Sequence, residues 1–169
     1  MVSVTVVSLG RPGRGATTVT HVEPRRGRVS MQVRWSDVDL FGHVNNAAFL
    51  RYLDDARFTV FPAMGVDEHG AMTASQLVVV KHEIDYLAPL TFRPRPFVVE
   101  VWVPRTGRSS VDFAYELVDE PESGPVVVLR ARSRMVQLDR DAATPRPFTV
   151  DERAAFDAYR GPEPVLHGW

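Results

Sequence analysis

Residues 35–57 read Trp35-Ser-Asp-Val-Asp-Leu-Phe-Gly-His-Val-Asn-Asn-Ala-Ala-Phe-Leu-Arg-Tyr-Leu-Asp-Asp-Ala-Arg57. The first part of this stretch is polar, and apolar residues recur at helical spacing only in its second part. The pattern predicts the end of a strand, a polar turn and then an amphipathic helix from about Ala47 to Phe61. Gly42 permits a positive φ or a close approach to a ligand, and Asn45 or Asn46 is a suitable N-cap for the helix.

The turn brings reactive side chains to the start of the predicted helix. The first backbone N–H groups of a helix lack intrahelical partners and carry the positive end of the macrodipole, so they can polarise a carbonyl or hold an oxyanion. Carboxylates and exposed N–H groups could therefore meet one substrate here. The structural alternative is an ordinary turn that caps an ordinary helix. The residues concerned are Asp37, Asp39, Gly42, His43, Asn45 and Asn46.

The residues on either side extend this pattern into a strand and a two-sided helix. A first strand is expected from near Arg28, because apolar and polar residues alternate from there to Trp35. The apolar side of the helix calls for a sheet to cover it, and on its polar side Arg51 and Asp55 are expected to form a surface pair. The apolar side consists of Phe49, Tyr52, Leu53, Ala56 and Val60, and the polar side of Arg51, Asp54, Asp55 and Arg57.

Four β-like runs follow without another helical pattern between them, and a short helix is expected near the end of the chain, at residues 151–160. One long helix and five strands in this order predict an α+β architecture, with an antiparallel sheet around the helix. The four runs are residues 75–87, 97–103, 109–118 and 125–138.

The motif Asp37-x-Asp39-x-x-Gly42-His43-Val44-Asn45-Asn46, followed by Phe49-x-x-Tyr52-x-x-x-Ala56-Arg57, resembles the acyl-CoA thioesterases of the hotdog fold. The likeness is nearest to the 4-hydroxybenzoyl-CoA thioesterase type, and the His-Val-Asn-Asn string is also similar to acyl-ACP thioesterases. The resemblance implies a hotdog fold, in which an antiparallel sheet of five or six strands wraps around one long central helix. It continues more loosely to about residue 138.

The length of 169 residues predicts one domain, and 44% hydrophobic with 24% charged residues exclude disorder throughout. We expect a flexible N-terminal extension at residues 1–27, the hotdog thioesterase domain at residues 28–140, and a C-terminal extension with a short helix at residues 141–169.

Composition also bounds the function. A net charge of −1 gives no reason to expect nucleic acid, and no apolar run approaches the roughly 18 residues that span a membrane. The absence of cysteine excludes a thiolate nucleophile and is compatible with a cytoplasmic location. No two histidines have the spacing of a helical metal site, so no metal is expected. No Gly-x-Ser-x-Gly elbow is present, which disfavours a serine hydrolase.

The resemblance implies roles for three residues of the turn. Asp39 matches the family's catalytic carboxylate, which would act as nucleophile or general base. The backbone N–H of Asn46 matches the carbonyl-polarising position. A histidine at the position of His43 is assigned to catalysis in the acyl-ACP relatives, but the asparagine that precedes it there by two residues is Phe41 here. His43 is therefore either an orienting or proton-transfer residue or a structural one, and Asp37 is expected to lie outside the site.

Substrate contacts are expected from three further groups. An apolar tunnel beside the helix would select the acyl group. The Gly-Arg-Ser-Ser turn is similar to the hotdog segment that lies near the nucleotide or pantetheine of coenzyme A, often across a subunit interface. Arginines at period two on the last strand share a face and could bind phosphates, although a charged strand face is the plainer interpretation. The residues are Phe41, Phe49, Tyr52 and Tyr86 for the tunnel, Arg108, Ser109 and Ser110 for the turn, and Arg132 and Arg134, after Arg130, for the strand.

The sequence thus predicts an acyl-CoA thioesterase that releases a free acid and coenzyme A. Coenzyme A is then part of the substrate, and no separate cofactor is expected. The alternatives are an acyl-ACP thioesterase, another hotdog enzyme such as a hydratase, and a non-catalytic acyl-binding protein. The resemblance also implies a homodimer or homotetramer, because hotdog sites are typically shared between subunits.

Overall fold

The computed structural model describes residues 25–66 and 75–167. The predicted N-terminal extension, residues 1–27, lies outside the described residues apart from its last three, and Gly27 already belongs to the first strand. The elements are β1 (Gly27–Met31), α1 (Asn46–Val60), β2 (Ser75–Tyr86), β3 (Phe97–Thr106), β4 (Ser110–Asp119), β5 (Val126–Asp139) and α2 (Val150–Asp157). Two short 3-10 helices, Trp35–Asp37 and Phe61–Met64, precede and follow α1.

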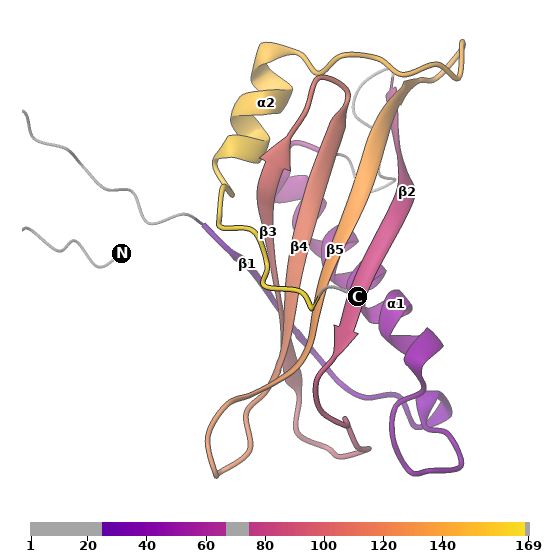
Figure 1. The fold of residues 1–169 in the computed structure, drawn as a ribbon, viewed down its shortest axis with the longest axis vertical. Helices are drawn as coiled ribbons and strands as arrows, with labels where there is room; N and C mark the ends of the chain where they lie inside the picture. Colours follow the sequence, from indigo (N-terminus) through magenta and orange to yellow (C-terminus); the bar gives the residue numbers. More distant parts are fainter. Residues whose placement is uncertain (1–24, 67–74, 168–169) are drawn as a thin grey trace, which may run out of the picture.

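The strands form one five-stranded sheet in the order β1-β3-β4-β5-β2, and every neighbouring pair is antiparallel. Helix α1 lies along one face of this sheet, and the segment after α2 crosses the opposite face (Figure 1). β1 and β2 are the edge strands. The predicted α+β architecture, with one long helix and an antiparallel sheet, is confirmed.

Helix α1 begins where its sequence provides a cap. Asn45 is the N-cap, and its side-chain oxygen accepts a hydrogen bond from the N–H of Ala47 at 2.9 Å. The helix ends at Val60, just before a 3-10 helix with Pro62 in its first turn and a left-handed Gly65 at its end. Both ends lie within one residue of the predicted bounds, because the apolar period and the cap indicate the same helix.

The core fills the space between α1 and the sheet. Leu53 and Ala56 of α1 are fully buried against sheet residues such as Phe97 and Phe113. Helix α2 adds to the same core through Phe156, which packs edge-on to Phe113 with ring centroids 6.0 Å apart. The C-terminal segment predicted as an extension therefore takes part in the core of the domain.

Strand β1 is shorter than the alternating pattern predicts. It pairs with β3 only from Gly27 opposite Val101 to Met31 opposite Phe97, where β3 begins. The residue before Phe97 is Pro96, which has no N–H to continue the ladder. The chain after Met31 therefore leaves the sheet, and Trp35 lies 77% exposed in a 3-10 helix instead of in a strand.

The polar side of α1 also differs from its prediction. Arg57 was expected on the exposed side, but its side chain is 2% exposed and faces the sheet. Its guanidinium donates to the hydroxyl of Tyr115 at 2.9 Å and to Asp54 at 2.5 Å. Arg57 follows Leu53 by four residues, so helical geometry places both on the buried face.

Within the described ranges, no helix is both long enough and apolar enough to cross a membrane.

Candidate active site

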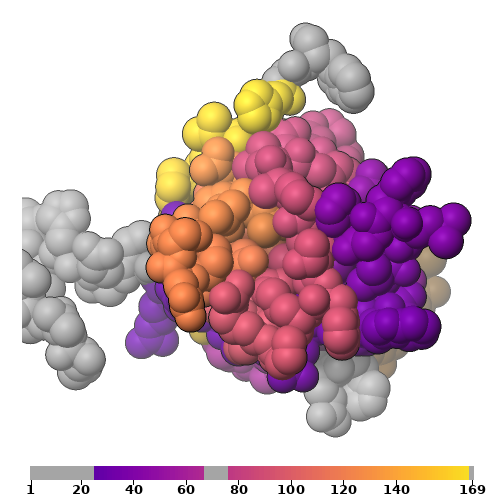
Figure 2. Space-filling view, turned by 90° about the horizontal axis from the view of Figure 1, so that it is seen from below, coloured from indigo at the N-terminus to yellow at the C-terminus, as the bar shows by residue number. Residues whose placement is uncertain are grey.

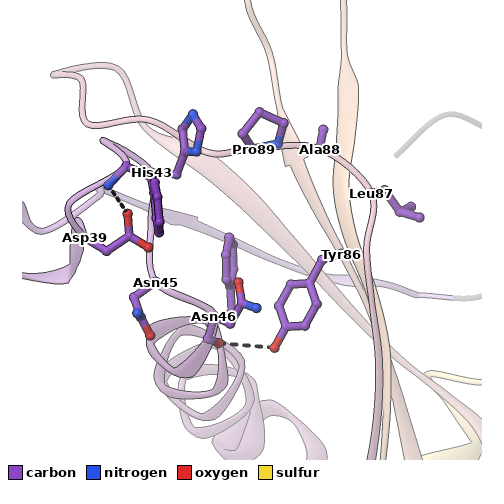
Figure 3. A pocket seen from close by; sticks show the side chains of 10 residues that line it. Asp39, His43, Asn45, Asn46, Tyr86, Leu87, Ala88 and Pro89 are labelled. Carbon is purple, nitrogen blue, oxygen red and sulfur yellow. Dashed lines mark hydrogen bonds between the residues drawn. The ribbon is translucent and has the colours of Figure 1, made fainter.

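A pocket of about 540 Å³ opens at the N-terminal end of α1. Its walls come from the loop that precedes the helix, from the first turn of the helix and from the chain that follows β2 (Figure 3). The lining residues are Asp39, Phe41, His43, Asn45, Asn46, Phe49, Tyr86, Leu87, Ala88 and Pro89. The pocket therefore brings together all three predicted catalytic residues.

One wall is a closed loop, residues 38–44, which we call the Asp39 loop. Val38 and Val44 form an antiparallel bridge at its base, and the N–H of Asp39 donates to the carbonyl of His43 at 2.9 Å. The N–H of Gly42 donates a hydrogen bond to the carbonyl of Asp39 at 3.0 Å, and Gly42 has a φ of 77°. Glycine adopts this φ far more readily than other residues, so the positive φ that Gly42 was predicted to permit is confirmed.

The Asp39 loop is fastened to the opposite wall of the pocket. The N–H of Val44 donates to the carbonyl of Leu90 at 2.8 Å, and His43 forms a bridge with Thr91. Seen from this end of the molecule, the indigo and purple atoms around the loop lie beside the rose atoms of the chain after β2 (Figure 2). These contacts hold the two walls at a fixed separation.

Asp39 presents part of its carboxylate to the pocket. Oδ1 accepts a hydrogen bond from the N–H of Phe41 at 2.9 Å, which fixes the side chain over its own turn. Among the described residues, no hydrogen-bond donor contacts Oδ2, and this oxygen faces the space between the loop and Tyr86 (Figure 3). One carboxylate oxygen therefore orients the group and the other is available for chemistry.

The first residue of α1, Asn46, lines the same pocket and has a backbone N–H that no described residue engages. The Asn45 side chain caps the N–H of Ala47, and the Asn45 carbonyl accepts from the N–H of Ala48 at 2.9 Å. No described residue accepts a hydrogen bond from the N–H of Asn46. That N–H lies at the positive end of the helix macrodipole and could polarise a carbonyl oxygen. Its predicted role stays a prediction.

Tyr86 closes the side of the pocket that β2 provides. Its hydroxyl donates to the carbonyl of Asn46 at 3.2 Å (Figure 3). Its ring centroid lies 5.7 Å from that of Phe49. Burial raises the pKa of the Tyr86 hydroxyl, which keeps it a neutral donor. Tyr86, Phe49 and Phe41 thus line the pocket together with the apolar residues Leu87, Ala88 and Pro89. Their part in a tunnel that selects the acyl group stays a prediction.

His43 lines the pocket, but its ring makes no hydrogen bond to any residue in the described part of the chain. The turn is held by the backbone carbonyl of His43, which accepts from Asp39. A structural role for the imidazole through a hydrogen bond within the turn is therefore without support in the geometry, and the ring is available to a bound molecule.

Tyr52 is not among the residues that line the pocket. It is 1% exposed, and its hydroxyl accepts a hydrogen bond from the N–H of Arg34 at 3.0 Å. Its ring packs edge-on against Phe97, with ring centroids 5.1 Å apart. The structure therefore places Tyr52 in the core, bonded to the chain that precedes the Asp39 loop and outside the pocket.

The Arg108–Ser110 turn lies at the far end of the sheet from the pocket (Figure 1). The carbonyls of Gly107 and Arg108 accept hydrogen bonds from Arg153 at 2.7 and 3.2 Å, which holds the turn against α2. Within one chain, this turn does not meet Asp39. A contribution from Arg108, Ser109 or Ser110 to the site would need a second subunit.

Arg132 and Arg134 also lie away from the pocket, and carboxylates occupy their guanidinium groups. Arg134 donates to both oxygens of Asp112 at 2.7 and 2.8 Å, and Arg132 donates to Glu83 at 2.9 Å and Glu163 at 3.0 Å. These hydrogen bonds raise the pKa of both arginines. The charges of this strand face are compensated within the chain, so phosphate binding here stays a prediction.

Sequence reasoning missed the buried network around Asp37. Asp37 is 5% exposed, and Arg34 donates to it at 2.9 Å and Arg51 at 2.7 Å. Arg51 therefore pairs with Asp37 and not with Asp55, which is the correction to the expected surface pair. The only local sign of the network is the three-residue spacing of Arg34 and Asp37, since Arg51 lies fourteen positions beyond Asp37.

Among residues 25–66 and 75–167, no group of three or more histidine, aspartate or glutamate side chains is arranged to hold a metal ion.

Comparison with known proteins gives the class to which this fold and pocket belong. Residues 33–156 match the family described as the thioesterase-like superfamily. An acyl-acyl carrier protein thioesterase of Arabidopsis thaliana, described as chloroplastic, is 27% identical over 112 residues, which are 66% of this chain and 57% of that protein. The chain thus spans little more than half the length of this relative.

Solved structures agree with the family match. A Thermus thermophilus thioesterase complexed with coenzyme A and zinc is 29% identical, with a TM-score of 0.65 over 76% of this chain and 95% of that one. A 1,4-dihydroxy-2-naphthoyl-CoA thioesterase from Synechocystis is 17% identical, with a TM-score of 0.67 over 78% and 96% of the two chains. At that identity the second likeness shows the fold alone.

The chain belongs to the thioesterase-like superfamily. The predicted hotdog fold is confirmed by this match and by the thioesterases that share the fold. The family and the 29% identical thioesterase agree with the predicted assignment to the thioester hydrolases. The narrower likeness to 4-hydroxybenzoyl-CoA thioesterases stays a prediction.

Proposed function

We propose that this protein is an acyl-CoA thioesterase, which hydrolyses the thioester between an acyl group and coenzyme A. The observation that carries the proposal is the shared pocket of Asp39 and Asn46. Asp39 offers a carboxylate oxygen and Asn46 a helix N-terminal N–H that no described residue engages, and both residues line the same cavity. Thioester hydrolysis needs little beyond these two groups, because the thiolate is already a good leaving group.

The substrate carbonyl oxygen would accept a hydrogen bond from the N–H of Asn46, where developing negative charge is stabilised. Asp39 would then act in one of two ways. As a general base, it takes a proton from water while the water oxygen bonds to the carbonyl carbon. As a nucleophile, it forms a mixed anhydride that water hydrolyses in a second step. In both routes the C–S bond breaks, the electron pair leaves on sulfur, and the thiolate finally takes up a proton.

The choice of coenzyme A as the carrier is supported by one relative. The Thermus thermophilus thioesterase is complexed with coenzyme A and is 29% identical to this chain. The second candidate is an acyl-ACP thioesterase, which the Arabidopsis relative favours. Phe41 stands where the acyl-ACP relatives have an asparagine, so coenzyme A is the preferred carrier here. Phe41, Phe49 and Tyr86 would contact the acyl group.

We also propose a homodimer or a homotetramer. β2 is an edge strand of twelve residues, and it exposes Val79, Val80 and Tyr86 by 37%, 55% and 45%. A long edge strand with exposed apolar side chains invites pairing with another chain. Since Tyr86 also lines the pocket, a second subunit on this edge would lie next to the site.

The test is thiol release from a panel of short, long and aromatic acyl-CoA thioesters, run beside the same acyl groups on acyl carrier protein. We expect hydrolysis of at least one acyl-CoA with a higher kcat/KM than its carrier-protein counterpart. Preference for the carrier-protein thioesters would support the second candidate. Binding of acyl-CoA without any thiol release would show a non-catalytic acyl-binding protein and overturn the proposal.

A further inference from the structure

Asp37 is the most buried carboxylate near the pocket, yet it does not line the pocket itself. It lies between two segments that the chemistry needs. The Asp39 loop begins at the next residue, and Arg51, which pairs with Asp37, belongs to α1. The position of Asp37 therefore affects both the carboxylate and the helix of the proposed site.

Two arginines hold the side chain of Asp37. Arg34 Nε donates to Oδ2 at 2.9 Å, and Arg51 Nη2 donates to Oδ1 at 2.7 Å. Arg51 belongs to α1, and the Tyr52 hydroxyl of the same helix accepts the N–H of Arg34 at 3.0 Å. The hydrogen bonds thus join the chain before the loop to the first two turns of α1.

The backbone of Asp37 completes the connection. Its carbonyl accepts the N–H of Asn45, the N-cap of α1, at 2.8 Å. Asp37 and Asn45 are therefore the two ends of the segment that contains the Asp39 loop, and they are bonded to each other directly. With the bridge between Val38 and Val44, this contact fixes where Asp39 lies relative to the start of the helix.

We propose that Asp37 is a positioning residue for thioester hydrolysis, which holds the Asp39 loop against α1 so that the Asp39 carboxylate and the Asn46 N–H address one substrate carbonyl. The inference rests on the proposed function of Asp39. Asp37 does not contact the reacting atoms, and its effect on the reaction passes through the geometry of Asp39. A small misplacement of a reacting group is enough to cost about a hundredfold in rate.

The experiment compares kcat and KM of the full-length protein and its variants with the acyl-CoA that the wild type hydrolyses fastest. We expect Asp37→Asn to lower kcat about tenfold to a hundredfold, with KM changed less than about threefold, because binding walls stay in place while the reactive geometry loosens. Arg51→Gln should act in the same direction, and Arg51→Lys should recover part of the loss. Arg51 is 59% exposed, so these variants keep the inference testable if Asp37→Asn fails to fold.

Glu152→Gln is the matched control for loss of a buried ion pair. Glu152 is 14% exposed and bonds to Arg146 at 2.6 Å, at the end of the molecule opposite the pocket (Figure 1). Its kcat should equal that of the wild type even if its unfolding midpoint falls as far as that of Asp37→Asn.

A double variant separates positioning from general weakening. If Asp37 acts through Asp39, Asp37→Asn should lower kcat less than about twofold when Asp39→Asn is already present. Losses that multiply would overturn the inference, and so would wild-type kcat in both Asp37→Asn and Arg51→Gln. Full activity of Asp39→Asn would instead overturn the proposed role of Asp39 itself, and the inference with it.

Discussion

Asp37 and Asp39 are two positions apart and have opposite environments. Asp37 is buried and accepts hydrogen bonds from two arginine side chains, whereas Asp39 accepts one backbone N–H and faces the pocket. The first arrangement uses a carboxylate to hold structure together, and the second leaves a carboxylate oxygen available to a substrate. The different roles of Asp37 and Asp39 follow from the hydrogen-bond donors that surround each side chain.

The environment of Asp37 predicts a pH dependence of stability. Burial opposes its ionisation, but the Tyr52 hydroxyl and the guanidinium groups of Arg34 and Arg51 outweigh this and lower its pKa from 3.8 to about 2. Because the folded pKa is the lower one, the ionised carboxylate stabilises the fold above pH 3.8, by about 2 kcal/mol, and this contribution is lost as the pH falls toward 2.

Urea unfolding of the wild type and Asp37→Asn across this pH range tests the prediction. The difference in unfolding free energy should be largest at neutral pH and should shrink between pH 4 and pH 2. A difference that stays constant over the whole range would show that Asp37 does not ionise with a lowered pKa.

At the residue scale, the sequence motif was enough to place Asp39, His43 and Asn46 in one pocket. It was not enough to assign Asp37 or Tyr52. The sequence around an aspartate in a polar turn does not show whether its side chain binds water or a distant arginine. The partner of Asp37, Arg51, lies fourteen positions away on α1. An aromatic residue on the apolar side of a helix predicts burial, but its hydroxyl bond to the chain before the loop depends on tertiary packing.

At the scale of elements, local signals predicted the helices well and the first strand less well. The ends of α1 are set by Asn45 and by the proline and glycine after it, all of which can be read from the sequence. The end of β1 is set by where its partner β3 begins, which is a non-local property. Alternation alone therefore extended the predicted strand past Met31.

The cap of α2 gives a prediction at this scale. Thr149 and Glu152 form a reciprocal capping box, with the Thr149 side chain accepting from the Glu152 N–H at 3.2 Å. Thr149→Ala should lower the free energy of unfolding by about 1 kcal/mol. Its kcat should not change, because α2 packs at the end of the sheet away from the pocket (Figure 1). Chemical denaturation and thiol release measure the two effects separately, and a loss of kcat would contradict the independence of α2 and the site.

At the scale of the whole molecule, the motif predicted the fold, but the sheet order and the ion pairs across it depend on pairings between distant segments. The row of Arg130, Arg132 and Arg134 was correctly predicted to share one face. That face also carries Glu116, Glu83 and Asp112 from neighbouring strands, so each arginine is paired within the chain. The sequence alone shows the spacing of the arginines, but it does not show which carboxylates of neighbouring strands pair with them.

Assembly through β2 is the prediction for the whole molecule. Val80 lies at the bulge of β2 and is 55% exposed on the edge. Val80→Lys should lower the molar mass measured by light scattering, because lysine on an edge strand opposes pairing with another chain. Val126→Lys, at the 40% exposed start of the inner strand β5, is the control and should leave the molar mass unchanged. A fully active wild-type monomer would contradict the proposed assembly.

The proposed mechanism depends on the Asp39 carboxylate, and its sharpest test is the rate of thiol release by Asp39→Asn. Asparagine keeps the size of the side chain and an oxygen that can accept from the Phe41 N–H, so the loop should persist while the charge is lost. The matched control is Asp141→Asn, at an exposed position beyond β5. We predict that Asp39→Asn lowers kcat at least about a hundredfold with an unchanged fold, whereas kcat near that of the wild type would contradict the mechanism.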